Sequence, residues 1–293
     1  MNHKDQFLEN QSMLYGIAYR MLGSFSDAED IIQDAWLRWQ RVHPSKVKSP
    51  TAYLASTVSR LCIDRQRRSR FEQLNYPGPW LPEAVDEEIS EMLTDTEANA
   101  DLAKNISLGF VSLLQKLPPV ERAVFILKEA FDFSHNEIAD TLEIQVAHSR
   151  QLLRRAKQKM SGEDTQPVNE QELRSLLEQF QAAATSGDLE GLKALMTEDI
   201  VAYNDGGGKA TAAIIPLVGL DRVCTVMMHL MSRMPDSITI TIEVINAEPA
   251  VIMRDGDTLH SCHSIAIKND RIHRIYTLRN PEKMRLIDNH QVN

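Results

Sequence analysis

Apolar residues recur at intervals of three and four along most of the first half of the chain, and this spacing predicts helices. Two helices are expected within residues 5–42, the second of them capped by Ser26 or Asp27, because both residue types favour the cap position of a helix. A third helix is expected over residues 52–70, where the apolar stripe gives way to a run of arginines. These segments predict one small helical module.

A helix, a tight turn and a second helix are predicted between Ser134 and Met160. Ser134 and Glu137 have the spacing of a capping box, which satisfies free backbone amides at a helix start. Residues 146–160 carry five Lys or Arg residues and no acid, so the second helix is basic. Such a helix fits the major groove of DNA, with the first helix crossing the backbone behind it. Because an arginine-rich face is also often only solvated, this stretch alone leaves both interpretations open.

Helices followed by strands are predicted for residues 168–293. Amphipathic helices are expected over residues 173–184 and 219–234. Alternating apolar and polar residues predict four later strands in the runs SITITIEVINA, PAVIMRD, TLHSCHSIAIK and RIHRIYTLR. An earlier strand, a glycine turn and a second strand are predicted in DIVAYNDGGGKATAAIIPLVG. Helices first and a curved antiparallel sheet afterwards indicate an α+β fold, so the whole chain is predicted to be multidomain.

Charge is distributed in blocks along the chain. The net charge of −9 and the isoelectric point near 5.5 by themselves argue against a polyanionic partner. Residues 1–71 nevertheless have a net charge of +4, and residues 102–160 have a net charge of +3. Residues 72–101 hold nine acids and no Lys or Arg, and residues 161–293 have a net charge of −7. Since local patches govern polyanion binding, two basic modules around an acidic connector still predict nucleic-acid binding.

The composition excludes several classes of protein. Only three cysteines occur, widely spaced, so neither a disulfide framework nor a zinc motif is expected, and no cofactor is predicted. No apolar run approaches the ~20 residues that cross a membrane. The N-terminal residues also lack the pattern of a secretory signal. We therefore expect a cytoplasmic protein with no membrane partner.

Two segments together resemble one protein family. The segment DAEDIIQDAWLRW, followed along the chain by AYLASTVSRLCIDRQRRSR, is similar to regions 2.1 to 2.4 of an extracytoplasmic-function (ECF) sigma factor of the sigma-70 family. The predicted helix-turn-helix, introduced by LPPVERAVFILKEAFDFSHNEIAD, is similar to region 4. Two residues depart from the family pattern, because Glu143 replaces a usual glycine and Ser149 replaces a usual apolar residue.

The resemblance implies a promoter-specificity subunit of bacterial RNA polymerase. It implies contact with core polymerase, at the β′ clamp and the β flap, and the clamp residues would be Asp30, Gln33, Asp34 and Arg38. The loop His43–Ser49 would capture an unstacked promoter base near position −10. The DNA-binding residues would be Arg60, Asp64, Arg65, Arg67 and Arg68 at the −10 element. At the −35 element they would be His148, Arg150, Gln151, Arg154, Arg155 and Lys157.

Three short motifs extend the resemblance to sigma factors that carry a fused SnoaL-like domain, a cone of the nuclear-transport-factor-2-like fold. The motifs are WLPEA in the connector, DGGGK and NPEKM. In such factors the extension regulates the sigma modules in cis, without a separate anti-sigma factor. The implied regulatory interface contains Trp80, Leu81, Pro82, Glu83, Asp205, Gly206, Gly207, Gly208, Lys209, Asn280, Pro281, Glu282 and Lys283. Lys209, Lys283 and Arg285 are expected to pair with acids of the connector, and a plain linker, a flexible hairpin and a frayed tail remain the alternatives.

These assignments divide the chain into four parts. Residues 1–71 are predicted to form sigma region 2, and residues 72–105 an acidic linker that contains the WLPEA motif. Residues 106–162 are predicted to form sigma region 4. Residues 168–293 are predicted to form the SnoaL-like regulatory domain.

Two other functions stay open from the sequence. A ligand-responsive transcription regulator would bind promoter DNA without polymerase, and a small-molecule isomerase would need an acid–base pair inside the cone. Candidate side chains for such chemistry are Tyr203, Asp205, His229, His260 and His263. His260 and His263 are expected on opposite sides of a strand, and Asp205 fits a local role in a turn. No catalytic residue is therefore predicted, although a small-molecule ligand of the cone stays open.

Overall fold

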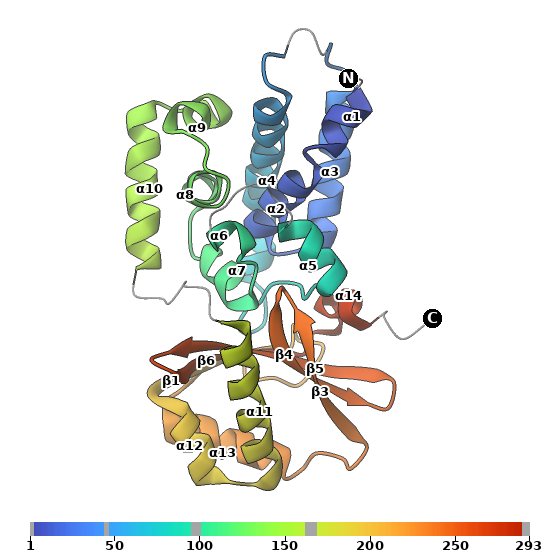
Figure 1. Cartoon of the computed structure of the whole chain (residues 1–293), viewed down its shortest axis with the longest axis vertical. Coiled ribbons are helices and arrows are strands. Elements are labelled where there is room, and N and C mark those ends of the chain that lie inside the picture. Colours follow the sequence, from blue (N-terminus) through green and yellow to red (C-terminus); the bar gives the residue numbers. More distant parts are fainter. Residues whose placement is uncertain (1–2, 44–46, 95–100, 162–168, 289–293) are drawn as a thin grey trace. The chain divides into compact units, whose positions relative to one another are not determined.

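The computed structural model describes residues 3–43, 47–94, 101–161 and 169–288 (Figure 1). The chain divides into two compact units. The helical unit comprises Met1–Leu74, Glu88–Ile106 and Phe110–Thr165, and the sheet unit comprises Asn75–Glu87, Ser107–Gly109 and Gln166–Asn293. The chain therefore enters the sheet unit directly after the first predicted module, long before its C-terminal half begins.

The first module of the helical unit contains α1 (His3–Leu8), α2 (Gln11–Leu22), α3 (Phe25–Trp39) and α4 (Pro50–Leu74). Gly23 ends α2 in the left-handed conformation, at φ 69°. Ser24 then caps α3, because its side chain accepts a hydrogen bond from the amide of Asp27. The expected cap at Ser26 or Asp27 is therefore wrong, because Ser24 is the cap and α3 begins at Phe25. Trp39 and Leu54 are among the largest fully buried side chains of this module.

The second module contains α5 (Glu87–Thr94), α6 (Asp101–Lys104), α7 (Leu108–Leu114), α8 (Pro119–Phe125), the π-helical turn η2 (Ile126–Ala130), α9 (His135–Leu142) and α10 (Val146–Met160). Arg122 of α8 joins it to the first module. Its guanidinium donates hydrogen bonds to the carbonyl oxygens of Gln115 at 2.9 Å and Leu117 at 3.1 Å, and to that of Met21 in α2. Burial lowers the pKa of Arg122 to about 9. Since a buried cation needs its hydrogen-bond partners, this arginine ties the two modules into one unit.

The sheet unit contains α11 (Glu170–Ser186), α12 (Leu189–Leu195), α13 (Leu220–Met231), the short turn η3 (Pro281–Lys283) and α14 (Arg285–Asp288). Its strands are β1 (Met196–Asp205), β2 (Leu217–Val218), β3 (Ile238–Ile245), β4 (Glu248–Asp255), β5 (Thr258–Lys268) and β6 (Arg271–Leu278). They form one sheet in the order β2-β1-β6-β5-β4-β3. Neighbouring strands pair antiparallel except β1 and β6, which are parallel. The expectation of a wholly antiparallel sheet is wrong at that pair, because α13 and three hairpins separate the two strands along the chain.

The two faces of the sheet have different cores. The inner face packs against α11, α12 and α13, and its core includes Leu177, Phe180, Val251, Ile265 and Ile275 (Figure 1). The outer face has a separate core, which includes Leu81, Ala84, Leu108, Ile252, Cys262 and Tyr276. Leu81 and Ala84 come from the connector, so this segment supplies part of the hydrophobic core of the sheet unit. The α+β cone implied by the resemblance is confirmed.

Candidate functional site

The helix-turn-helix lies in α9 and α10, as the sequence predicts. Ser134 and Glu137 form the expected capping box, each side chain accepting a hydrogen bond from the other residue's amide. Glu143 ends α9 in the left-handed conformation, at φ 54°, where glycine is the usual residue. Ser149 is fully buried, and its hydroxyl lies 2.9 Å from Nδ1 of His135. The second departure from the family pattern is thus accommodated by a hydrogen bond between the two helices.

The six residues predicted to meet the −35 element are all exposed along α10: His148, Arg150, Gln151, Arg154, Arg155 and Lys157. Arg155 contacts Glu121 at 3.3 Å, and Lys157 contacts Glu129 at 2.8 Å. In each pair the cation is half-exposed and the carboxylate is largely buried, 8% exposed in Glu121 and 20% in Glu129, so Arg155 and Lys157 are partly engaged within the helical unit. Within the described residues neither Arg150 nor Arg154 has an ion-pair partner. These two arginines are therefore the most available for DNA.

Arg60 of the predicted −10 surface is held by the turn of the helix-turn-helix. Its Nε donates a hydrogen bond to the carbonyl oxygen of Thr141 at 2.8 Å. Its Nη1 lies 2.7 Å from the Glu143 carboxylate. Ser56, one turn earlier on α4, donates to the same Thr141 carbonyl at 3.0 Å. In this form of the protein α4, which carries the residues predicted for the −10 element, therefore shares hydrogen bonds with α9, the first helix of the helix-turn-helix.

The remaining residues predicted for the −10 element do not form one free surface. Arg65 is paired with Asp27 of α3. Arg67 lies 3.5 Å from Asp64, and both side chains are exposed. Arg68 is exposed and donates to the carbonyl oxygen of Asp64 at 3.3 Å. Arg67 and Arg68 are thus better placed than Arg60 or Arg65 to contact phosphates in this form.

The residues predicted to bind core polymerase lie together on the solvent side of α3. Asp30, Gln33, Asp34 and Arg38 are all exposed, and the exposed side chain of Leu37 adds an apolar group to this polar face. The loop predicted to capture the −10 base, His43–Ser49, includes residues 44–46, which lie outside the described residues.

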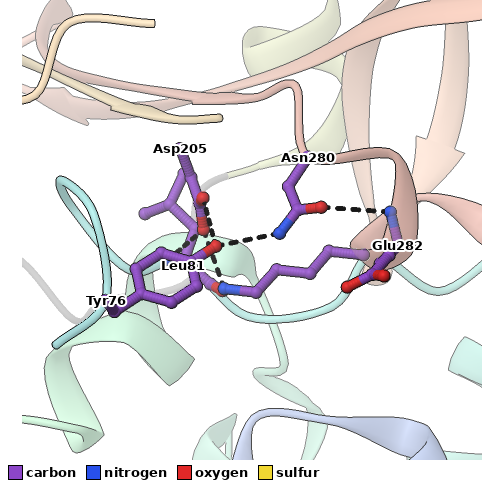
Figure 2. Close-up of polar contacts among 6 residues, drawn as sticks. Tyr76, Leu81, Asp205, Asn280 and Glu282 are labelled. Carbon is purple, nitrogen blue, oxygen red and sulfur yellow. Dashed lines mark hydrogen bonds and ion pairs between the residues drawn. The ribbon is translucent and has the colours of Figure 1, made fainter. Parts of the chain in front are cut away.

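Asp205, at the end of β1, is the centre of a polar site in the sheet unit (Figure 2). Its fully buried carboxylate accepts a hydrogen bond from the Tyr76 hydroxyl at 2.5 Å. The other carboxylate oxygen accepts hydrogen bonds from the Leu81 amide and from Nζ of Lys283, each at 2.8 Å. Asn280 donates from its side chain to the Tyr76 hydroxyl at 2.9 Å. The WLPEA, DGGGK and NPEKM motifs therefore meet at one carboxylate, and these five residues are called the Asp205 site.

Lys283 is the cation of this site, and its side chain is only 14% exposed. Its Nζ also donates to the Leu81 carbonyl at 2.6 Å. The Nζ lies 4.1 Å from the ring centre of Trp80 and 4.5 Å from that of Tyr76. Burial lowers the pKa of Lys283 to about 8, although the Asp205 carboxylate acts in the opposite direction. The lysine is thus fixed by a charge, a carbonyl oxygen and two aromatic faces.

The partners of the predicted cations differ from the expectation. Lys283 pairs with Asp205, Lys209 pairs with Glu282, and Arg285 donates to the Glu282 carbonyl at 3.1 Å. These partners are Asp205 and Glu282 of the sheet unit's own motifs, while Glu83 of the connector also acts on Lys283 electrostatically and raises its pKa. The connector also presents the Leu81 carbonyl and the rings of Trp80 and Tyr76 to Lys283.

The DGGGK segment forms a packed turn. Gly207 and Gly208 have φ values of 58° and 70°, which favour glycine. A Cβ atom on Gly207 would collide with the side-chain amide of Asn280, and one on Gly206 would collide with the carbonyl of Ala210. In the connector Leu81, Pro82 and Glu83 are buried and Trp80 is half-buried. A flexible hairpin and a plain linker therefore do not describe these two segments.

The side chains considered for catalysis are dispersed. Tyr203 stacks on Tyr276, with ring centres 5.5 Å apart, and Asp205 belongs to the ion pair above. His229 is exposed on α13. Among the described residues no group of three or more His, Cys, Asp or Glu side chains is arranged to hold a metal ion.

His260 and His263 lie closer together than the sequence predicts. His260 Nδ1 lies 3.3 Å and His263 Nε2 lies 2.8 Å from the same hydroxyl, that of Ser261. The expectation of opposite sides is wrong, because the β4–β5 register shifts between Met253 and Arg254. Burial lowers the pKa of His263 to about 4, so this ring is neutral at pH 7.

Two residues that hold the connector, Tyr76 and Asn246, were missed by the sequence analysis. Tyr76 was not identified, although an aromatic residue in an acidic, proline-rich stretch is a signal for burial. Asn246 was also missed; its amide donates to the Val85 carbonyl at 2.9 Å, and its side chain accepts from the Val85 amide at 3.1 Å. These contacts join segments far apart in the sequence, and spacing alone does not reveal them.

A DNA-binding helix-turn-helix, an arginine-bearing helical module and a connector built into an α+β cone define a multidomain transcription protein. Residues 7–72 match the family model described as Sigma-70 region 2, and residues 108–160 match the model described as Sigma-70, region 4. The chain belongs to the ECF RNA polymerase sigma factors and has the promoter-selecting function of that family. A regulator that acts without polymerase is not favoured.

The similarity to known proteins extends through both units. The ECF RNA polymerase sigma factor SigJ of Mycobacterium tuberculosis is 32% identical over 226 residues, which are 75% of this chain and 70% of that protein. The probable ECF RNA polymerase sigma factor SigI of the same species is 26% identical over 278 residues, 94% of this chain and 92% of that protein. The crystal structure of SigJ matches with a TM-score of 0.76 and 26% identity, covering 95% of this chain and 97% of that one. Across the described ranges, every helix is too short or too polar to cross a membrane.

Proposed function

We propose that the sheet unit controls promoter recognition by this sigma factor in cis, by holding the connector between regions 2 and 4. The observation that carries this proposal is the Asp205 site. Tyr76 and Leu81 of the connector bind the buried Asp205 carboxylate, and Lys283 near the C-terminus binds the same group. The connector, which must change its path when regions 2 and 4 separate, thus forms part of the core of the sheet unit.

The form of the helical unit supports a closed, inactive state. Positions −10 and −35 are 25 base pairs apart, or roughly 85 Å at 3.4 Å per base pair. In contrast, Arg60 of region 2 is 2.8 Å from the Thr141 carbonyl of region 4. The two modules in this form therefore do not reach both promoter elements at once, and binding requires that α4 and α9 separate.

We also propose the finer contacts of the active state. The exposed face of α3, with Asp30, Gln33, Asp34 and Arg38, would bind the β′ clamp, and region 4 would bind the β flap. Arg67 and Arg68 would hold phosphates near the −10 element. Arg150 and Arg154 would contact the −35 element. In this scheme the sheet unit takes the place of a separate anti-sigma factor.

We further infer that the cone is regulatory and has no catalytic activity of its own. The neutral His263 ring lies between hydroxyl groups, 2.8 Å from that of Ser261 and 3.1 Å from that of Thr277. The Asp205 carboxylate is saturated by donors of the connector and Lys283. A general acid–base pair requires groups that can exchange protons with a substrate, and these groups are already engaged.

Run-off transcription with purified core polymerase on a pool of genomic fragments tests the regulatory proposal. The variant Lys283→Met removes the cation of the Asp205 site, and the matched control Lys268→Met removes an exposed lysine of β5. We expect Lys283→Met to raise transcript yield several-fold and Lys268→Met to leave it unchanged. Equal or lower yield from a folded Lys283→Met variant would contradict control by the connector. Arg67→Ala and Arg150→Ala should lower the yield in either background.

A further inference from the structure

The β3 strand forms one edge of the sheet, and the described residues provide no neighbour on its outer side. It pairs only with β4, in continuous register from Ile238 opposite Asp255 to Ile245 opposite Glu248. The two-residue turn at Asn246 and Ala247, with φ values of 55° and 60°, fixes that register. This turn makes Ile245 and Glu248 a hydrogen-bonded pair, so Thr241 and Glu243 also point their backbone groups toward β4. The backbone groups of Ile240, Ile242 and Val244 consequently point outward.

The outer edge of β3 lacks the features that usually prevent edge pairing. Natural edge strands are often shortened, bulged, or protected by lysine or proline. β3 is eight residues long, reads ITITIEVI, and shows no register shift against β4. Its one charged residue is Glu243, and its other residues are β-branched types that favour strands. Such an edge is suited to accept another extended strand.

The sequence of β3 is complementary to itself in one antiparallel register. When two copies are centred on Ile242, Ile240 faces Val244 of the second copy, so apolar residues meet on the inner face. Thr241 then faces Glu243 of the second copy. The same two side chains already form a 2.7 Å hydrogen bond within one strand. This register also separates the two Glu243 carboxylates, so no like charges face each other.

We propose that β3 pairs with β3 of a second copy of this chain, about a two-fold axis at Ile242, and that the two sheets become continuous. The three outward pairs supply about six backbone hydrogen bonds, two from each pair. The partner strand also covers apolar groups that are half-exposed in one copy. Ile238 and Ile240 line a hollow of about 300 Å³ together with Met228 and Met231. Burial of these apolar side chains adds a hydrophobic contribution to the free energy of dimerisation, beside that of the backbone hydrogen bonds.

The helices of the inner face leave room for this pairing. α11 packs on β4, so two copies of α11 would be separated by three strand spacings, about 14 Å. Packed helices need only about 8–10 Å between their axes, so no clash follows. Gln181 of α11 is the one described side chain on the outward backbone groups, and its Nε2 lies 3.5 Å from the Ile240 carbonyl. A bond of that length is weak, and the second strand's amide replaces it.

Cysteine cross-linking of the full-length chain tests the register. Thr241 and Glu243 of the second copy form a non-hydrogen-bonded pair with Cα atoms about 4.5 Å apart, within the range of a disulfide. We expect an intermolecular disulfide when Thr241→Cys and Glu243→Cys chains with different tags are mixed under oxidising conditions. Neither variant should cross-link with itself, because the like positions are too far apart. The native Cys62, Cys224 and Cys262 are buried and do not compete. Self-cross-linking, or none in the mixture, overturns the proposed register.

The mass of the protein in solution tests the surface itself. Sedimentation equilibrium over a concentration series should give a species of twice the 33.2 kDa chain mass. Ile242→Lys places two like charges at the two-fold axis and should raise the dimer dissociation constant at least tenfold. Val218→Lys places the same charge at the exposed opposite edge, on β2, and should leave the dimer intact. Circular dichroism checks that both variants are folded. A monomer at all concentrations, or a dimer unaffected by Ile242→Lys, overturns the proposal.

Discussion

The buried ion pair between Lys283 and Asp205 is the contact through which the connector is proposed to be held, and a double-mutant cycle measures its strength. The changes are Lys283→Met and Asp205→Asn, singly and together. Methionine keeps most of the lysine's length, and asparagine keeps the carboxylate's shape. The double variant removes both charges, so it separates the coupling of the pair from the effect of each side chain.

The burial of the pair sets the expected magnitude. The Lys283 side chain is 14% exposed and the Asp205 side chain is fully buried. Removing one partner of a buried pair leaves an uncompensated charge and typically destabilises by about 3–5 kcal/mol. The double variant leaves no such charge, so we expect a coupling free energy of about 2 kcal/mol or more. The exposed pair Lys209–Glu282 is the matched control, and its coupling should stay below about 1 kcal/mol.

The pair also predicts a pH dependence with a defined sign. The pKa of Lys283 is lowered from 10.5 to about 8 in the folded protein, mainly by burial. Between these values the unfolded chain holds a proton that the folded chain has released, so stability rises with pH in this window. From pH 8 to pH 9.5 the wild type should gain about 1.5 kcal/mol relative to Lys283→Met, because the folded lysine is already half deprotonated at pH 8. Measurements stop below pH 10, because the raised pKa of Tyr76 has the opposite effect once unfolded tyrosines ionise.

Urea unfolding of the full chain, followed by hydrogen exchange of peptides from residues 75–87 and 280–284, provides the assay. Exchange resolves the sheet unit from the helical unit, which bulk fluorescence does not. If the stability losses of Lys283→Met and Asp205→Asn simply add in the double variant, the ion pair contributes no coupling free energy and the proposed contact is contradicted. A stability difference between wild type and Lys283→Met that does not change with pH would contradict the lowered pKa.

Two further substitutions test local geometry by thermal unfolding. Gly207→Ala combines a left-handed backbone with a collision at Asn280, so it should lower the free energy of unfolding by more than 2 kcal/mol. Gly256→Ala is the control: it has a similar φ of 57° but open space around it, so it should lower the free energy of unfolding by about 1 kcal/mol. Equal losses of stability would contradict the packed turn. Glu143→Gly should stabilise the helical unit by about 0.5 kcal/mol, because relief of the left-handed strain exceeds the loss of the exposed ion pair with Arg60. A clear loss of stability would show that this ion pair is stronger than its exposure implies.

The sequence predicted those features of the fold that depend on a few neighbouring residues. The capping box at Ser134 and Glu137 is read from a spacing of three, and the helix-turn-helix follows from local periodicity. The β1–β6 parallel pair could not be read in this way, because the strand order depends on how α13 and three hairpins pack. The β-bulge at His260 was also hidden, since it depends on the register against β4.

The Asp205 site shows a similar division between what the sequence indicates and what it hides. Resemblance predicted that the three motifs belong together, and the structure places them at one carboxylate. It did not predict the partners, since Tyr76 is 129 positions from Asp205 in the sequence. The expectation of pairing with connector acids rested on charge alone and did not identify Asp205 as the ion-pair partner of Lys283. In this buried site the Asp205 carboxylate and the aromatic faces hold the lysine, and the buried Glu83 of the connector acts on it without an ion pair as close as that with Asp205.

The connector and the C-terminal half of the chain both contribute to the outer core of the sheet unit. This sharing determines which experiments can separate an effect on regulation from an effect on folding. Leu81 of the connector and Leu108 are fully or almost fully buried in the outer core. Deleting the chain from about residue 168 would expose both side chains and leave Tyr76 without its carboxylate partner. Such a deletion changes the connector as well as removing the regulator, so a change in transcription from it has two explanations. Substitution at Lys283 keeps every residue of the outer core and removes the cation that binds Asp205 and the Leu81 carbonyl, with the loss of about 3–5 kcal/mol expected above. Control in cis therefore predicts that the point variant reproduces the release caused by deletion while the sheet unit remains folded.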